Sequence, residues 1–297
     1  METTTVDQYP DCVQLTSGAF RIAVTTTVGP RVLAGHIGDS PNIFRIMPDQ
    51  PVPQAQTDFR LRGGHRLWHS PEAAPRTYAA DNDPVDVTET EDGVCFSRGL
   101  EPLTGLEKSI TIQPLGEEKL RVTHRLINRG QWPVELAPWA LSVMAPGGTA
   151  VIPQHRNPEG DMFTPDRNLV LWPYTHLDDK RLNMGRNYIF IHQDPAVDHR
   201  LKIGFNAEDG WIAYVNNGVA LVKHFEHYVD ALYPDNGCSV ESFASAHFCE
   251  IETLAPLHEL ATGDMAEHVE VWQGINDMPD IKGDDDVEQH LLPKLAE

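Results

Sequence analysis

Cysteine, basic residues and long apolar runs are all scarce in this chain of 297 residues. Its four cysteines, Cys12, Cys95, Cys238 and Cys249, are widely spaced and include no CxxC pair. This spacing argues against a disulfide framework and against a cysteine-based zinc motif, and it favours four reduced, partly buried thiols. The scarcity of cysteine therefore excludes the class of small disulfide-rich secreted domains.

Basic residues number 23 against 44 acidic ones, which gives a formal net charge of −21 with histidine neutral. Nucleic acids and anionic membranes both need surfaces rich in lysine and arginine, so we expect neither as a partner. No stretch approaches the roughly 18 apolar residues of a membrane-spanning helix. The amino-terminal METTTVDQYP lacks the basic start and apolar core of a signal peptide, so a cytoplasmic location is expected.

The sequence is rich instead in short β-type segments separated by Gly, Pro, Asn and Asp. Two hairpins are predicted at 85–98 and 108–128, the first with a turn at Glu91-Asp92-Gly93. Three strands in a meander are predicted over 201–225. Since helical periodicities are few, the pattern indicates an all-β domain, and the number of strands indicates a large sandwich.

The chain shows no internal repeat and no low-complexity linker, so residues 1–276 are predicted to form a single domain. Residues 36–84 are rich in proline and polar residues and are expected to form long loops, which often build binding sites. Residues 277–297 are expected to be an acidic carboxy-terminal tail, with a short helix capped by Asp284-Asp285-Asp286.

Two glutamates on one predicted strand are the first candidates for chemistry. Residues 248–253 are typical of a strand, and strand side chains alternate between faces. Glu250 and Glu252 therefore point to the same side. Two carboxylates on one face of an interior-looking strand pack poorly, but they suit acid–base chemistry.

A second dense segment lies at residues 59–72. It combines planar, cationic and aromatic side chains with a Gly63-Gly64 pair, namely Arg60, Arg62, His65, Arg66, Trp68 and His69. Sugar sites use this mixture, because rings stack on C–H faces while arginine and histidine bind hydroxyls. The alternative for this segment is a bent strand with a buried tryptophan and solvated charges.

Polar and aromatic residues gather a third time at 152–161 and 171–181, where several prolines predict loops that ring an opening. The candidates there are His155, Trp172, His176 and Arg181. The i,i+4 spacing of His65 and His69 does not form the helical zinc pattern, because neighbouring Gly and Pro deny them a helix. A calcium site near Asp178, Asp179 or Asp235 stays open, but no metal or other cofactor is predicted.

The order of these blocks resembles an uncharacterised domain family of the galactose-mutarotase-like, or aldose 1-epimerase-like, superfamily. The resemblance spans roughly residues 15–275 and rests on GGHRLWHSPE at 63–72, VELAPWALSVMAPGG at 134–148, LVLWPYTHLDDKR at 169–181, and YPDNGCSVE with EIETLAPL at 233–257. It implies a β-supersandwich with long loops, a sugar-sized concave site, and a small-molecule sugar or sugar acid as partner.

Galactose mutarotases open the sugar ring with a glutamate base and a histidine acid. Their base lies in a strand reading FCLET, and FCEIET at 248–253 resembles this motif with one residue added. The resemblance therefore implies Glu252 as the base, with Glu250 on the same face as the alternative. The block that holds the family's acid resembles VELAPWALSV, which places Trp139 where the histidine belongs. The family's LHGG block resembles 61–64, with Arg62 in place of its histidine. The proton would then come from His65, His69, His155 or His176.

Substrate contacts are expected from Arg62, Arg66, Trp68, His155, Trp172, Arg181, Lys223, Asp235 and Glu241. The arginines favour an acidic sugar, since a guanidinium binds carboxylates and phosphates well. Three functions stay open: an isomerase of the aldose 1-epimerase type, a carbohydrate-binding protein that has lost the acid, and a glycosidase or lyase with paired carboxylates.

Overall fold

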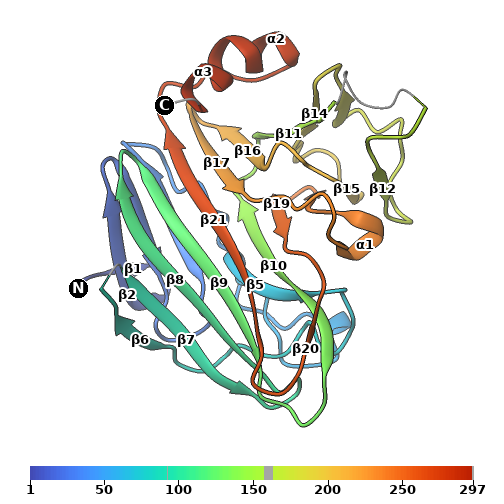
Figure 1. The fold of residues 1–297 in the computed structure, drawn as a ribbon. Coiled ribbons are helices and arrows are strands. Elements are labelled where there is room, and N and C mark those ends of the chain that lie inside the picture. Colours follow the sequence, from blue (N-terminus) through green and yellow to red (C-terminus); the bar gives the residue numbers. More distant parts are fainter. Residues whose placement is uncertain (92, 157–162, 296–297) are drawn as a thin grey trace.

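The computed structural model describes residues 1–91, 93–156 and 163–295. Within these residues the strands form two antiparallel sheets, of 11 and 10 strands, that pack face to face (Figure 1). The prediction of a large all-β sandwich is therefore confirmed. No helix among the described residues has the length and apolar character needed to cross a membrane.

The first sheet runs, in order across the sheet, β1 (Glu2–Val6), β2 (Tyr9–Ser17), β3 (Phe20–Val24), β4 (Val32–Ile37), β5 (Gly64–Ser70), β10 (Val134–Met144), β19 (Cys249–Leu254), β18 (Val240–Ala244), β15 (Leu201–Phe205) and β12 (Leu169–Leu171), with β20 (His258–Leu260) paired to β10. The second runs β13 (Leu182–Met184), β14 (Tyr188–His192), β11 (Thr149–Pro153), β16 (Trp211–Asn216), β17 (Val219–Phe225), β21 (Met265–Ile275), β9 (Lys119–Asn128), β8 (Leu106–Gly116), β7 (Val94–Glu101) and β6 (Asp86–Glu89).

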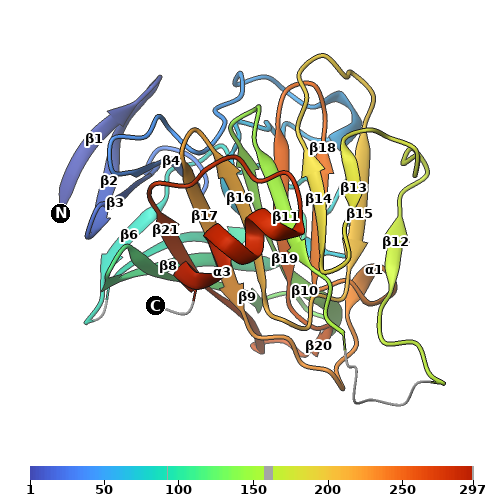
Figure 2. The same ribbon diagram turned by 90° about the horizontal axis from the view of Figure 1, so that it is seen from above.

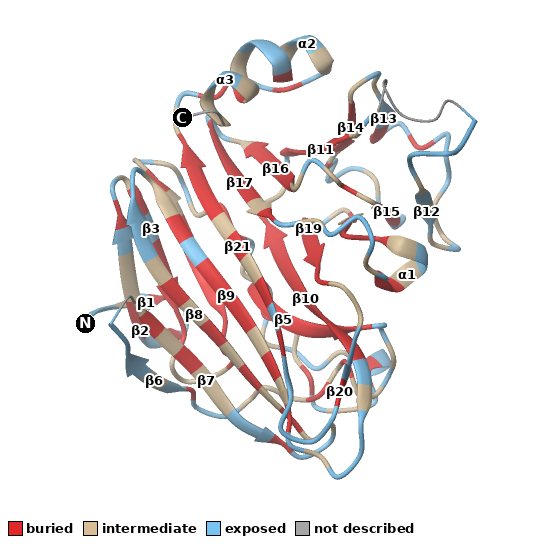
Figure 3. Ribbon diagram, in the orientation of Figure 1, coloured by how far each residue is buried: buried red, intermediate tan, exposed pale blue. Residues whose placement is uncertain are grey.

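The core lies between the sheets because apolar residues recur at every second position of the central strands. In β9, Leu120, Val122 and Leu126 are fully buried, and in β19 Ile251 faces the same core. Buried residues are concentrated in β10, β17 and β19, whereas β6 at the edge is exposed (Figure 3). This alternation fixes which side chains of each strand remain on the outer face.

The predicted hairpins are confirmed as the pairs β6–β7 and β8–β9, with position 92 of the first turn outside the described residues. The predicted meander over 201–225 is wrong in one strand. The pair β16–β17 lies in the second sheet, but β15 lies in the first, between β18 and β12. Periodicity alone predicts a strand without saying which sheet the strand joins.

The predicted long loop over 36–84 contains a central strand, β5, whose residues are all buried. The chain enters β5 through Arg62, Gly63 and Gly64, which all have positive φ angles (45°, 80° and 68°). A Cβ atom on Gly63 would lie 1.9 Å from the carbonyl oxygen of Arg45, so this position requires glycine. The alternative of a strand with a buried tryptophan is therefore confirmed for this segment, but Arg62 and Arg66 are buried rather than solvated.

The carboxy-terminal segment folds onto the outer face of the second sheet (Figure 2). It contains α2 (Asp284–Asp286), the π-helical turn η2 (Val287–Leu291) and α3 (Leu292–Leu295); η1 (Pro53–Ala55) and α1 (Pro234–Gly237) are the other helical turns among the described residues. The predicted helix is present, but the predicted aspartate cap is wrong, because Gly283 holds the N-cap position without a side-chain hydrogen bond. Asp284 instead accepts the backbone N–H groups of Arg186 and Asn187.

Candidate functional site

The outer face of the first sheet carries a cluster of ionisable and aromatic side chains at its centre. Strand register places Glu252 of β19 opposite Leu141 of β10 on one side and Glu241 of β18 on the other. Arg66 of β5 lies opposite Leu141. We call Arg66, Trp68, Trp139, Lys202, Glu241, Glu250 and Glu252 the outer-face cluster. Sequence-distant residues meet here because five adjacent strands share one face.

Glu252 is one of two fully buried carboxylates in the outer-face cluster, with 0% of its surface exposed. Its Oε2 accepts a hydrogen bond from Trp139 Nε1 at 2.9 Å and lies 3.0 Å from Lys202 Nζ. Its Oε1 has no hydrogen-bond partner among the described residues. Since an indole N–H only donates, Trp139 orients the carboxylate without supplying a transferable proton.

Lys202 lies between two glutamates, with its Nζ 2.7 Å from Glu241 Oε2 as well as 3.0 Å from Glu252 Oε2. The same Nζ is 4.7 Å from the ring centroids of Trp139 and Trp172. Burial lowers the pKa of Lys202, but the two carboxylates outweigh it and hold that pKa well above its ordinary value. Lys202 therefore stays charged.

Glu241 is fully buried beside this ammonium group. Burial raises the pKa of Glu241 well above its ordinary value, with Lys202 opposing the shift and the charge of Glu252 adding to it. Neither Oε atom of Glu241 makes a hydrogen bond of good geometry within the described residues, although Oε2 is ion-paired to Lys202. The cluster thus holds buried carboxyl oxygens that can still accept hydrogen bonds.

Glu250 is held by an arginine rather than a lysine. Arg66 Nη1 lies 3.2 Å from Glu250 Oε1, and the Arg66 guanidinium stacks 4.1 Å from the Trp68 ring. Burial raises the pKa of Glu250, with Arg66 opposing and the charge of Glu252 adding to the rise. Glu250 and Glu252 therefore have different partners and are not interchangeable.

A loop after β12 covers the cluster. Trp172 stacks on Lys202, and Thr175 Oγ1 donates to the backbone oxygen of Lys202 at 2.5 Å. A Cβ atom at Gly204 would lie 2.3 Å from Cys238 Sγ and 3.3 Å from the Trp172 ring, so glycine lets the loop approach β15. Burial raises the pKa of Tyr174 to about 12, with Lys202 opposing and Glu252 adding, which places its hydroxyl near the same charges.

Two predicted contact residues, Arg62 and Arg181, are buried and already paired away from the outer-face cluster. Arg62 binds Asp49 and Asp81, and Arg181 binds Asp179 at 2.7 Å. Hydrogen bonds from Arg181 and His199 overcome the effect of burial and lower the pKa of Asp179.

Two more predicted residues lie on the outer side. Asp235 of α1 accepts from Ser70 Oγ at 3.1 Å, at the end of β5. His176 is exposed on the loop that carries Trp172. Among the described residues, the side chains of Asp178, Asp179 and Asp235 do not form a ligand set for a cation.

Three other predicted residues face the opposite direction, into the space between the sheets. His65 Nε2 lies 2.7 Å from His124 Nε2, and Lys223 Nζ lies 3.0 Å from Glu270 Oε1. His69 is buried on the same face of β5 as His65. Burial lowers the pKa of His69, and the charge of Lys108 across the core lowers that pKa further. Because β5 alternates, Arg66 and Trp68 reach the outer-face cluster while His65 and His69 do not.

The buried residues around Glu270 form what we call the interior network, namely His65, His124, Lys223, Thr253, His268, Glu270 and Trp272. Burial raises the pKa of Glu270, but Lys223 and the neighbouring histidines outweigh this effect and lower that pKa to about 2. Glu270 is therefore an anion. Burial lowers the pKa of His268 to about 3, with Glu270 opposing, so His268 is neutral.

His65, His124 and Glu270 bring three metal-ligand atoms within 4.8 Å of one another. Hydrogen bonding accounts for this geometry without an ion. Ser142 can donate to His65 Nδ1, His65 Nε2–H to His124 Nε2, and His124 Nδ1–H to the carbonyl of His268. The Lys223 ammonium already neutralises Glu270, so a divalent ion would add uncompensated buried charge.

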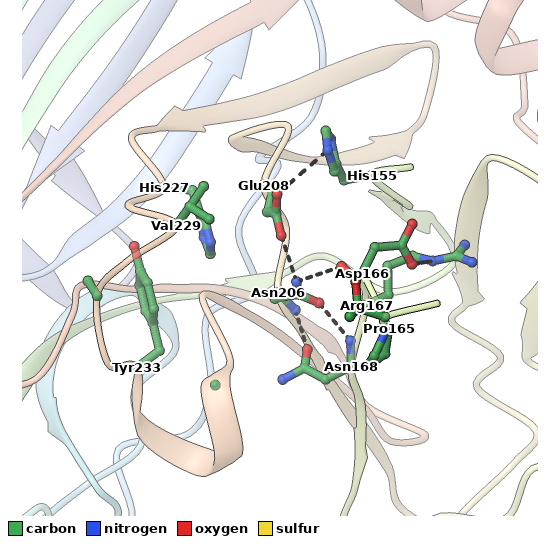
Figure 4. Close-up of a pocket in the computed structure, with 13 residues that line it drawn as sticks. His155, Pro165, Asp166, Arg167, Asn168, Asn206, Glu208, His227, Val229 and Tyr233 are labelled. Atoms are coloured by element: carbon green, nitrogen blue, oxygen red, sulfur yellow. Dashed lines mark hydrogen bonds and ion pairs between the residues drawn. The ribbon is translucent and has the colours of Figure 1, made fainter. Parts of the chain in front are cut away.

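A separate polar cavity of about 760 Å³ lies between β15 and α1 (Figure 4). His155 lines it and pairs with Asp209 at 2.8 Å and with Glu208 at 3.6 Å. His227 stacks on Tyr233 in the same wall, with ring centroids 4.8 Å apart. The lining includes neither Glu250 nor Glu252, so His155 belongs to this cavity rather than to the outer-face cluster. Positions 157–161 of the predicted polar segment lie outside the described residues.

Lys202, which is central to the cluster, is not among the residues predicted from the sequence. A signal was present in the segment LKIGF at 201–205. Leu201, Ile203 and Phe205 alternate toward the core, which leaves Lys202 and Gly204 on the other face. A lysine at such a position of a buried strand needs a carboxylate partner.

The two packed antiparallel sheets define a β-sandwich of the galactose-mutarotase-like type. The chain is similar in structure to a galactose mutarotase-like protein from Lactobacillus casei, with a TM-score of 0.54, 11% identity, and 89% of this chain and 99% of that one covered. It is also similar to a galactose mutarotase related enzyme from Lactobacillus acidophilus, with a TM-score of 0.52, 9% identity, and coverage of 91% and 99%. Neither a protein-family model nor a curated protein sequence matches the chain. At such low identity, the structural similarity shows a shared fold.

Proposed function

We propose that this protein interconverts the anomers of a small sugar, an isomerase reaction of the aldose 1-epimerase type, at the outer-face cluster. The observation that carries the proposal is the Glu252 carboxylate. Trp139 and Lys202 hold one of its oxygens, and the other has no hydrogen-bond partner among the described residues. A buried carboxylate that is oriented through one oxygen can accept a proton through the other.

In this reaction Glu252 takes the proton of the anomeric hydroxyl. The C1–O5 bond breaks as the ring oxygen is protonated, the aldehyde turns about the C1–C2 bond, and the ring closes on the other face. The reaction needs a proton acceptor and a proton donor near C1, and it needs no cofactor. The names of the two structural neighbours support this class of chemistry.

The substrate we propose is a neutral aldose. The acidic sugar expected from the sequence depended on arginines that were free to bind an anion. Arg62 is paired with Asp49 and Asp81, Arg66 with Glu250, and Arg181 with Asp179. A neutralised guanidinium offers little to a second carboxylate, whereas the open carboxyl oxygens of the cluster suit hydroxyl donors.

The direct test is the rate of anomer exchange in Glu252→Gln, measured by polarimetry or saturation-transfer NMR over a panel of neutral aldoses and uronates. The amide keeps the shape but cannot accept a proton, so the rate should fall by about 10²–10⁴-fold. Glu259→Gln, at an exposed site on β20, should keep the wild-type rate. The proposal is wrong if Glu252→Gln and Glu250→Gln both leave the rate unchanged.

The second candidate function is carbohydrate binding without catalysis. The observation that favours it is that the loop after β12 lies over the outer-face cluster. Glu252 is fully buried beneath the loop that carries Trp172, so a substrate must displace that loop. A binding protein would show heat of binding to a sugar in calorimetry with no acceleration of mutarotation. Its affinity should fall in Trp172→Ala, and an unchanged affinity in Trp172→Ala and Trp68→Ala would move binding away from this face.

A further inference from the structure

We infer that Glu241 is the proton donor of this site, so that acid and base are two glutamates on neighbouring strands that share one proton around Lys202. This inference rests on the proposed function and supplies the acid that the sequence left unassigned.

The strand register places the two glutamates side by side. Glu241 of β18 lies directly opposite Glu252 of β19. Residues that are directly opposite in an antiparallel pair have Cβ atoms about 4.5–5.5 Å apart. The ring oxygen and the anomeric hydroxyl of a sugar are both attached to C1, so two carboxyl groups at this separation can contact both oxygens at once.

Both side chains contact Lys202 through one oxygen, although Glu252 also accepts a hydrogen bond from Trp139. Lys202 Nζ contacts one oxygen of each, at 2.7 Å for Glu241 Oε2 and 3.0 Å for Glu252 Oε2. The remaining oxygens, Oε1 of Glu241 and Oε1 of Glu252, are buried and have no hydrogen-bond partner among the described residues. Buried polar atoms without partners are rare, and here each glutamate keeps one oxygen that can bind a substrate oxygen.

Charge balance in a buried site favours a single proton on the pair. Lys202 of β15 contributes one positive charge, whereas Glu252 of β19 and Asp235 of α1 face Glu241 as negative charges. With both glutamates ionised, Lys202, Glu241 and Glu252 together would carry a net negative charge away from solvent, and with one proton these three side chains are neutral. Asp235, which is half-buried, adds a further negative charge that disfavours ionisation of both glutamates. The raised pKa of Glu241 assigns that proton to Glu241, as like charges do in other carboxyl pairs.

The proton transfers balance. The Glu252 carboxylate accepts the proton of the anomeric hydroxyl, the C1–O1 bond becomes a carbonyl, and the C1–O5 bond breaks while the Glu241 carboxylic acid protonates O5. Ring opening leaves Glu252 protonated and Glu241 ionised. After the aldehyde turns, the reverse transfers close the ring and restore both groups, with no oxidant, reductant or co-reactant.

The test compares the wild-type protein with Glu241→Gln, Glu241→Asp and Glu252→Gln. Glu241→Gln should lower kcat by about 10²–10⁴-fold with a small change in KM, and it should remove the alkaline limb of the pH profile. Glu241→Asp keeps a titrating group and should retain part of the rate and that limb. The double variant should be no slower than Glu252→Gln alone, because the two groups act in one step.

A readout independent of activity is the carbon-13 NMR signal of the glutamate carboxyl groups at neutral pH. The wild-type protein should show a protonated carboxyl signal that is absent from Glu241→Gln, and circular dichroism checks that each variant is folded. The inference would be overturned if Glu241→Gln kept the wild-type kcat and pH profile while Glu252→Gln was inactive. That result would leave the proposed function intact. Absence of anomer exchange in the wild-type protein would overturn both.

Discussion

At the scale of single residues, the site depends on one lysine that serves two glutamates. Lys202 is the nearest cation to both Glu241 and Glu252 in the described residues, and Trp139 and Trp172 cover it with their rings. The ammonium group therefore orients Glu252 and also permits two carboxyl groups to be buried together. A lysine in this position stabilises the fold and defines the charge of the site.

Lys202→Met should lower the free energy of unfolding by about 3–5 kcal/mol, because it leaves buried carboxyl groups without their cation. The remaining glutamates will bind protons more tightly when folded than when unfolded, so the loss should be smaller at mildly acidic than at mildly alkaline pH. Urea unfolding at the two pH values measures this. Lys180→Met, at an exposed position, is the control, and an equal loss in both variants would contradict the role of Lys202.

At the scale of elements, Gly204 of β15 gives the loop after β12 room to pack against the strand. Gly204 leaves the space in which Cys238 and the Trp172 ring meet over the strand. Gly204→Ala should cost about 1–3 kcal/mol through overpacking and should displace Trp172. The displacement is measurable as a change in tryptophan fluorescence relative to the wild-type protein. An unchanged spectrum and stability would show that the loop does not depend on this contact.

The interior network links β5, β9, β17, β19 and β21 through neutral histidines. Because burial lowers the pKa values of His65, His124 and His268, to about 3 for His268, the unfolded chain binds these protons at higher pH than the folded one. Stability should therefore fall as pH drops from about 6.5 toward 3, by about 1.4 kcal/mol per pH unit for His268, and His65 and His124 should add to the fall in the same direction.

The lowered pKa of Glu270 acts in the same direction at lower pH. Its stabilisation is present above the ordinary glutamate pKa and is lost as pH falls toward about 2. Urea denaturation across this range measures both effects together. His65→Gln should make the pH dependence shallower, and a flat profile in the wild-type protein would contradict the assignment of neutral buried histidines.

The same elements explain how far the sequence could predict the site. The shared face of Glu250 and Glu252 follows from alternation within one strand, which local sequence reveals. The positions of Lys202 and Glu241 depend on which strands pair with β18 and β19. The sequence predicted β15 as part of a meander with the two strands that follow it, whereas β15 pairs with β18. His65 and Arg66 are adjacent in sequence and face opposite sides, which only the recognition of β5 as a strand would have shown.

At the scale of the whole molecule, the two sheets are strongly unequal in what they carry on their outer faces. The first sheet carries the outer-face cluster. The second is covered by the carboxy-terminal segment, where Val287 and Leu291 are fully buried against residues such as Phe190 and Trp211. The sequence predicted an acidic tail with a short helix here, and the helical spacing of its apolar residues is what packs it on the sheet.

Leu291→Ala should therefore lower the free energy of unfolding by about 2–5 kcal/mol, as expected for truncation of a buried leucine. Asp285→Ala, in the same segment but without burial, should change it by no more than about 0.5 kcal/mol. Chemical denaturation of the two variants distinguishes an integral segment from a detached tail. Equal stabilities would contradict the packing of this segment on the second sheet.

The central claim is that Glu252 exchanges a proton with the anomeric centre of a neutral sugar. Saturation-transfer NMR on a carbon-13-labelled aldose measures anomer exchange directly, for the wild-type protein and for Glu252→Gln at equal concentration. We expect exchange well above the uncatalysed rate with the wild-type protein and a rate reduced by about 10²–10⁴-fold with Glu252→Gln. Equal exchange in the two samples, or none above the uncatalysed rate in either across the panel of aldoses, would contradict this claim.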